Sequence, residues 1–155
     1  MIEIEANTIV RKSPEEVMSF VSDFENAPKW QTGVVRSELV TPPPVRAGSR
    51  FEEDVKVALW KMRATCEVTK YDAPRLIAFH TTSTGPIEYG GEFRFEPVHD
   101  GTRVVVRGQV RLKGLWKLIQ PLFAADIRKE TQAEMNTLKR VLEGDAGSGA
   151  IQATN

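Results

Sequence analysis

Hydrophobic and polar residues alternate along most of this chain, and a period of two residues is typical of half-buried β-strands. In residues 2–10, Ile2, Ile4 and Val10 fall on one side and Glu3 and Glu5 on the other. Further strands are expected at residues 34–40, 50–59, 62–69, 75–82, 87–96 and 104–112. The pattern therefore predicts seven strands, and it leaves open which side of residues 75–82 faces inward.

Helical spacing interrupts the strands once, directly after the first of them. Residues 13–16 (Ser-Pro-Glu-Glu) have the sequence of a helix N-terminus. Ser13 is suited to the N-cap, a proline in the first turn loses no hydrogen bond, and Glu16 completes a capping box. A second short turn of helix is expected at residues 29–31, so two short helices should follow the first strand.

A long amphipathic segment, residues 115–142, follows the last strand, with Pro121 predicting a kink or a restart. At about 1.5 Å per residue it spans roughly 30 Å or more, comparable to a ten-residue strand. A strongly curved antiparallel sheet needs such a helix to cover its concave face, and the space between them is usually a pocket. The predicted fold is α+β, with one domain at residues 1–143 and a flexible tail at 144–155.

Composition narrows the choice of partners. Lysine plus arginine and aspartate plus glutamate both number 21, so the net charge is zero. Nucleic-acid and anionic-membrane partners usually require a basic excess or patch, and no nucleic acid is expected. The single cysteine, Cys66, excludes an internal disulfide. No apolar run is long enough to span a bilayer and no signal-peptide pattern begins the chain, so we expect a soluble cytoplasmic protein.

Several kinds of chemistry have no matching motif in the chain. The two histidines and one cysteine do not have the spacing of zinc ligands. No serine or cysteine lies in a nucleophile elbow, and no glycine-rich phosphate loop precedes a helix. We therefore expect no metal and no cofactor, and the pattern predicts no oligomeric state.

Short motifs along the chain occur in the order found in a known superfamily. They are Val10-x-x-Ser13-Pro14-Glu15-x-Val17, Asp23…Asn26-x-Pro28-x-Trp30, Gly48-x-x-Phe51, Val68-x-x-Tyr71-x-x-Pro74-x-x-Ile77-x-Phe79, Phe93-x-Phe95-x-Pro97 with Gly101-Thr102-x-Val104, and Gly114-Leu115…Pro121-Leu122. Over roughly residues 2–143 the chain resembles the START-like (SRPBCC) superfamily, which includes the polyketide cyclase/dehydrase and lipid-transport proteins. The resemblance implies a helix-grip fold, in which a seven-stranded curved sheet wraps around a long C-terminal helix. It implies no single activity, because members bind lipids, sterols, quinones, polyketides and hormones, and only some are enzymes.

Three polar residues are weak candidates for catalysis. Glu53 lies on the apolar-facing register of its strand, where a desolvated carboxyl would act as acid or base or orient a ligand. The alternative, which we favour, is a carboxylate near the strand end that reaches solvent. His80 is either a proton shuttle in the cavity or a surface residue, because Phe79 competes for the inward position. Tyr89 either offers its hydroxyl to a ligand or is a core tyrosine satisfied within the protein.

The cavity should be lined mainly by apolar side chains. The expected ligand-binding residues are Trp30, Phe51, Glu53, Val55, Met62, Tyr89, Phe93, Leu118, Leu122 and Phe123. Trp30 resembles a tryptophan near the pocket mouth of relatives, and it also suits a role in packing the helix pair onto the sheet. Trp60 or Trp116 is expected at the lip of the cavity.

Three functional hypotheses follow from these observations. The leading one is that the protein binds or carries a hydrophobic small molecule, such as a lipid, a quinone or a polyketide-like compound, between the sheet and the C-terminal helix. The second is a polyketide cyclase or dehydratase-type enzyme that uses general acid–base catalysis. The third is a chaperone-like module whose groove holds another protein chain.

Overall fold

The computed structural model describes residues 1–57, 59–83 and 85–144. Its strands are β1 (Ile2–Val10), β2 (Val34–Leu39), β3 (Arg50–Val57), β4 (Trp60–Asp72), β5 (Leu76–Thr81), β6 (Ile87–Val98) and β7 (Gly101–Leu112). Its helices are α1 (Pro14–Ser22), the 3₁₀ helix η1 (Phe24–Asn26), α2 (Ala27–Trp30), the 3₁₀ helix η2 (Gly114–Ile119) and α3 (Gln120–Glu143). The predicted tail, apart from Gly144, lies outside the described residues.

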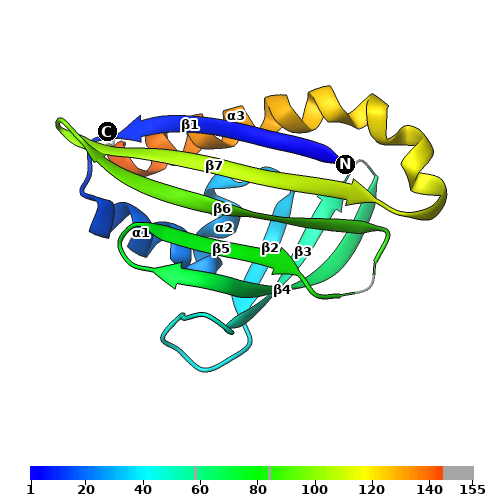
Figure 1. Ribbon diagram of the computed structural model, residues 1–155, viewed down its shortest axis with the longest axis horizontal. Coiled ribbons are helices and arrows are strands. Elements are labelled where there is room, and N and C mark those ends of the chain that lie inside the picture. Colours follow the sequence, from blue (N-terminus) through cyan, green and yellow to red (C-terminus); the bar gives the residue numbers. More distant parts are fainter. Residues whose placement is uncertain (58, 84, 145–155) are drawn as a thin grey trace.

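The seven strands form one antiparallel sheet in the order β1-β7-β6-β5-β4-β3-β2. Consecutive strands from β2 to β7 are neighbours, whereas β1 joins the sheet beside β7, the last strand. This arrangement places α1, η1 and α2 across one end of the sheet, because they connect its two edge strands (Figure 1). The predicted α+β helix-grip fold is confirmed.

Helix α3 lies along β1 and runs in the same direction (Figure 1). Three of its side chains donate hydrogen bonds to backbone carbonyls of that edge strand. Arg128 Nε lies 3.0 Å from Glu3 O, Gln132 Nε2 lies 3.1 Å from Asn7 O, and Lys139 Nζ lies 2.7 Å from Ile9 O. The exposed edge of the sheet is thus covered by the helix, which prevents pairing with another chain there.

The predicted helix boundaries are largely confirmed. Ser13 is the N-cap of α1, and Glu16 closes the capping box. The segment before α3 is a separate 3₁₀ helix, and Pro121 lies in the first turn of α3, where its missing N–H costs no hydrogen bond. Pro121 therefore marks a restart of the helix. No helix in the described part of the chain is both long and apolar enough to cross a bilayer.

The centre of the sheet contains facing glycines on β6 and β7. Gly91 is paired with Gly108, and a Cβ atom added to Gly91 would lie 2.4 Å from the carbonyl oxygen of Arg107. The pairing of β6 with β7 is regular through Gly90 and Gly91, with no shift of register. Glycine is required here because the two backbones approach too closely for any side chain.

The main core lies between the concave face of the sheet and the helices. Its largest fully buried side chains include Phe95, Met18, Ile77, Met135 and Leu138. Strand β5 turns Ile77 and Phe79 toward this core and His80 outward, which settles the orientation that the sequence left open. Met135 and Leu138 of α3 join core residues of the sheet and of α1, so the last helix is an integral part of the domain.

Candidate ligand-binding cavity

Two adjoining cavities lie between the sheet and α3. The inner cavity has a volume of about 230 Å³ and the outer cavity about 400 Å³. Tyr89, Val110, Ile127 and Glu130 line both of them. Because these four side chains line both cavities, the two cavities are adjacent compartments of one site. The volume of the outer cavity, taken by itself, is within the range of volumes found for small-molecule sites.

Aromatic rings form one wall of the inner cavity. Phe24 of η1 stacks on Phe51 of β3 with ring centroids 3.8 Å apart, and Phe79 stacks on Phe93 at 6.1 Å. These four rings all line the cavity. Such a wall offers apolar contact area with little loss of side-chain entropy, because packed aromatic rings are already ordered.

A buried carboxyl group lies among these rings. Glu53 of β3 is 5% exposed, and Tyr89 Oη donates a hydrogen bond of 2.8 Å to Glu53 Oε1. The thiol of Cys66 lies 3.7 Å from Tyr89 Oη and donates to it. Burial raises the pKa of Glu53, while the bond from Tyr89 partly opposes that rise. Burial and the neighbouring Glu53 also raise the pKa of Tyr89, so its hydroxyl remains a donor.

Helix α3 adds two carboxyl groups to the same cavity. Glu130 and Glu134 both line the inner cavity, and the backbone N–H of Thr32 donates a 2.9 Å hydrogen bond to Glu134 Oε2. Burial, opposed by that hydrogen bond and reinforced by Glu130 and Glu53, raises the pKa of Glu134 to about 8. Burial and Asp126 raise the pKa of Glu130.

Neither glutamate on α3 was identified from the sequence. Their spacing contains a signal, because Ile127, Thr131 and Leu138 lie on the face of the helix that carries Glu130 and Glu134. Glutamates at i, i+4 within an otherwise apolar stripe are unfavourable unless the stripe borders a cavity.

The carboxyl groups of the inner cavity have no cationic counterpart there. Its described lining contains no lysine, arginine or histidine. The outer cavity adds one lysine, Lys56, together with Asp126. Among the residues described by the structure, no group of three or more histidine, cysteine, aspartate or glutamate side chains is arranged to hold a metal ion. The chemistry available in the inner cavity is therefore that of carboxyl and phenol groups, together with the amides of Gln31 and Gln109 and the hydroxyl of Thr131, among apolar walls.

The structure brings most of the expected cavity residues together. Phe51, Glu53 and Phe93 line the inner cavity, Val55, Met62 and Phe123 line the outer one, and Tyr89 lines both. The solvent-reaching placement that we favoured for Glu53 is wrong, because the side chain points into the interior. Tyr89 satisfies its hydroxyl within the protein and also borders the cavity.

Three other expected cavity positions need correction, and His80 takes one of its two expected placements. Trp30 is buried edge-on against Phe93, at a centroid distance of 5.8 Å, and belongs to the core instead of the cavity lining. Leu118 and Leu122 are 78% and 74% exposed and line neither cavity, because no residue of η2 is buried and the first turn of α3 leaves Leu122 on the surface. His80 is exposed on the side of β5 opposite to Ile77 and Phe79, so the surface alternative is confirmed.

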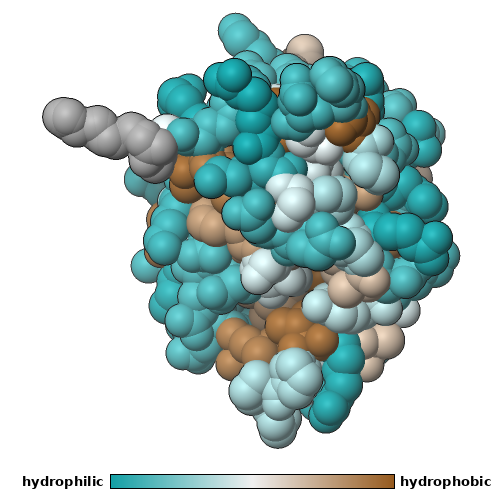
Figure 2. Space-filling model, turned by 90° about the vertical axis from the view of Figure 1, so that its left-hand side faces the viewer, coloured by the Kyte–Doolittle hydropathy of each residue, from teal (hydrophilic) through white to brown (hydrophobic). Residues whose placement is uncertain are grey.

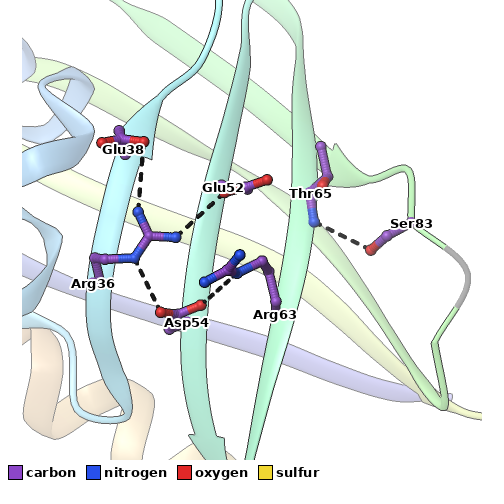
Figure 3. Close-up of polar contacts among 7 residues, drawn as sticks. All are labelled: Arg36, Glu38, Glu52, Asp54, Arg63, Thr65 and Ser83. Atoms are coloured by element: carbon purple, nitrogen blue, oxygen red, sulfur yellow. Dashed lines mark hydrogen bonds and ion pairs between the residues drawn. The ribbon is translucent and has the colours of Figure 1, made fainter.

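The outer face of the same strand has a different polar arrangement. Asp54 accepts hydrogen bonds from Arg36 Nε at 3.0 Å and from Arg63 Nε at 2.9 Å (Figure 3). These two guanidinium groups lower the pKa of Asp54 to about 2. Glu38 and Glu52 surround Arg36 in turn, at 3.6 and 3.3 Å. Each charged group in this cluster therefore has an oppositely charged partner within the protein.

Solved structures with the same fold match nearly the whole chain. TTHA0849 from Thermus thermophilus has a TM-score of 0.79 and 22% identity, with 95% of this chain and 99% of that chain covered. A START superfamily protein from Mycobacterium smegmatis has a TM-score of 0.77 and 18% identity, with 92% and 98% covered. The ZhuI aromatase/cyclase from Streptomyces sp. R1128 has a TM-score of 0.76 and 17% identity, with 95% and 98% covered.

Comparison at the level of sequence gives two results. No curated protein sequence matches the chain. The model of one protein family, described as polyketide cyclase / dehydrase and lipid transport, matches residues 1–143. The chain therefore belongs to the polyketide cyclase / dehydrase and lipid transport family.

Proposed function

We propose that the protein binds a hydrophobic small molecule in the cavity between the sheet and α3. The observation that carries this proposal is the pair of adjoining cavities with aromatic and aliphatic walls. Burial of apolar ligand surface there contributes roughly 25 cal/mol per Å², before the cost of ordering the ligand. The family description, which includes lipid transport, agrees with this proposal.

The polar groups of the inner cavity define which end of a ligand fits there. Glu53 and Glu134 offer carboxyl oxygens, Glu130 adds a third carboxyl group, and no cation lines this compartment within the described residues. A ligand with a hydroxyl or amine group can donate to these oxygens. A carboxylate would bring a buried negative charge into a compartment whose described lining holds no cation to pair with it, which opposes binding. We therefore propose an apolar ligand whose polar group is a hydrogen-bond donor.

Three ligands with equal chains but different polar groups test this proposal: dodecanol, dodecylamine and dodecanoate, measured by isothermal titration calorimetry. We expect the alcohol and the amine to bind, and dodecanoate to bind at least about tenfold more weakly, which corresponds to roughly 1.4 kcal/mol. Ile127→Trp should abolish binding because Ile127 lines both cavities. Ile9→Trp, at an exposed position of β1, is the matched control.

Two results would contradict the proposal. If none of the three compounds binds and the purified protein retains no apolar compound in native mass spectrometry, the cavity is not a binding site. If Ile127→Trp binds as the unaltered protein does, the ligand lies elsewhere. If only dodecanoate binds tightly, the carrier function is still supported. The proposal that the polar group of the ligand is a hydrogen-bond donor is then refuted.

A second candidate is a cyclase or dehydratase-type reaction, favoured by the position of Glu134. A carboxyl group with a pKa of about 8 is protonated at neutral pH, as a general acid must be. In a dehydration it would give its proton to the departing hydroxyl, while a second carboxylate takes a proton from the neighbouring carbon. Mass spectrometry of the bound compounds distinguishes the two candidates. A catalyst would convert a hydroxylated ligand into a product that has lost water and release it, whereas a carrier would leave the ligand unchanged.

A further inference from the structure

Large apolar side chains are exposed at the end of the molecule where η2 connects β7 to α3, at the right of Figure 1. The set is Leu59, Trp60, Leu115, Leu118 and Leu122, which we call the apolar rim. Their exposed fractions range from 56% for Trp60 to 94% for Leu59. Side chains this exposed project from the surface.

The apolar rim adjoins the outer cavity. Trp60 of β4 packs edge-on against Trp116 of η2, with ring centroids 4.4 Å apart. Trp116 itself lines the outer cavity together with Phe123. The two tryptophans thus connect the projecting leucines to the apolar interior, and Trp116 lies at the edge of the cavity.

Cationic side chains accompany the apolar rim. Lys56 and Lys61 face each other across β3 and β4, and Lys117 belongs to η2. All three are exposed, and among the described residues none of them forms an ion pair. Lys113 and Arg111 lie near Glu88, at 3.1 and 3.9 Å. A chain of zero net charge therefore has a locally basic end.

The opposite end of the molecule looks different. Figure 2 shows that end, at the left of Figure 1, where hydrophilic residues predominate and hydrophobic ones form separate small areas. Monomeric proteins rarely expose many large apolar side chains together without a role in binding. The projecting leucines, the tryptophan pair and the lysines therefore distinguish the end of the molecule at η2 from the opposite end.

We infer that the apolar rim docks on an anionic lipid surface, which brings the outer cavity into contact with the membrane interface. Leucine and tryptophan side chains insert between lipid headgroups, and lysines are attracted to acidic lipids. Projecting side chains suit a fluid surface that closes around each of them, whereas a folded protein partner would need matching pockets. The inference adds a location at which an apolar ligand would be exchanged, and it does not depend on which ligand is bound.

Sedimentation with lipid vesicles tests the inference. The full chain should co-sediment with vesicles of phosphatidylcholine containing about one third phosphatidylserine, and much less with pure phosphatidylcholine. Leu118→Asp with Leu122→Asp should reduce the partition coefficient at least about tenfold, because two inserting side chains become charged. Lys61→Glu with Lys117→Glu should reduce it at least about fivefold for each lysine, and added salt should reduce binding of the unaltered protein.

Matched controls come from residues outside the apolar rim. Val40→Asp introduces a charge at another exposed apolar position, and Lys70→Glu reverses a charge near the opposite end of β4. Both should bind vesicles as the unaltered protein does, and circular dichroism should show all variants folded. The inference is overturned if the unaltered protein does not bind anionic vesicles, or if control and rim variants lose binding equally. It is also overturned if the rim variants abolish only self-association or binding to a protein in sedimentation velocity experiments.

Discussion

Glu53 and Asp54 are adjacent in β3, yet their carboxyl groups lie in opposite environments. Glu53 points into the cavity, receives one hydrogen bond from Tyr89, and has a raised pKa. Asp54 points to the outer face, receives hydrogen bonds from two arginines, and has a pKa lowered to about 2. The alternation of a β-strand separates these environments by a single residue.

The difference identifies which carboxyl groups are available to a ligand. Around Asp54 the protein supplies its own counter-charges, so this group stabilises the packing of β2, β3 and β4 (Figure 3). Around Glu53 and Glu134 the inner cavity supplies no cation among its described residues. Unbalanced buried acids decrease the stability of the folded protein when they ionise, so their presence is more easily explained by binding than by stability.

The largest expected effect comes from Glu134. Its pKa is raised from 4.5 to about 8, so the folded protein holds a proton that the unfolded chain releases, and stability falls as the pH rises from about 4.5 to 8. Glu134→Gln should remove most of this loss, because its amide oxygen can still accept from Thr32. The free energy of unfolding at pH 9 should increase by about 3 kcal/mol, measured by urea denaturation.

The control for this comparison is Glu96→Gln, at an exposed position of β6. It should change the stability equally at pH 5 and pH 9. If Glu134→Gln is no more stable than the unaltered protein at pH 9, the carboxyl group of Glu134 is not desolvated, and the distinction between the two faces of the sheet weakens.

An intermediate effect is expected from Tyr89→Phe, which removes the hydrogen bond to Glu53 while leaving the ring in the cavity wall. Loss of this donor should destabilise the fold by about 1–2 kcal/mol. The loss should be larger above the raised pKa of Glu53 than below it, because the ionised carboxylate needs the donor more than the neutral acid does. Thermal and urea unfolding measure both values.

Tyr71→Phe is the matched control, since Tyr71 is partly exposed on β4. A loss in Tyr89→Phe that is the same at every pH would mean that the hydrogen bond does not distinguish the ionised from the neutral form of Glu53. In that case the hydrogen bond stabilises the fold as any other buried hydrogen bond does, whatever the charge of Glu53.

The smallest effect is expected on the outer face. The depressed pKa of Asp54 means that its ion pairs stabilise the fold fully above about pH 4, and that this contribution is lost as the pH falls from 3.8 to about 2. Asp54→Asn should therefore be less stable than the unaltered protein at pH 7, with the difference vanishing at about pH 2. High salt should also reduce it. A difference that persists undiminished at acid pH would assign the effect to packing instead of charge.

The sequence predicted the fold well because alternation and helix caps are local signals. The register of β3 placed Glu53 on the apolar side without any knowledge of its neighbours, and Pro121 marked the restart before α3. Which side of β5 faced inward was not predictable, because Ile77 and Phe79 on one side and Leu76 and Ala78 on the other are all apolar.

The site itself was predicted less completely. Glu134 owes its role to a cavity formed between α3 and the distant strand β3, and such a contact has no local signature. Leu118 and Leu122 fit an apolar helical stripe in the sequence, yet the stripe is divided between η2 and α3 and both side chains are exposed. Trp30 was placed at the cavity mouth on a resemblance to relatives, while the packing of its ring on Phe93 buries it.

The position of β1 also affects when the domain can fold. This strand leaves the ribosome before the other elements of the domain, and its neighbours β7 and α3 are synthesised after all the other strands. The nascent chain must therefore hold β1 unpaired until translation of the domain is nearly complete. Domain assembly then requires the closure of a loop spanning most of the sequence, which slows folding and makes exposed strands a natural substrate for chaperones during synthesis.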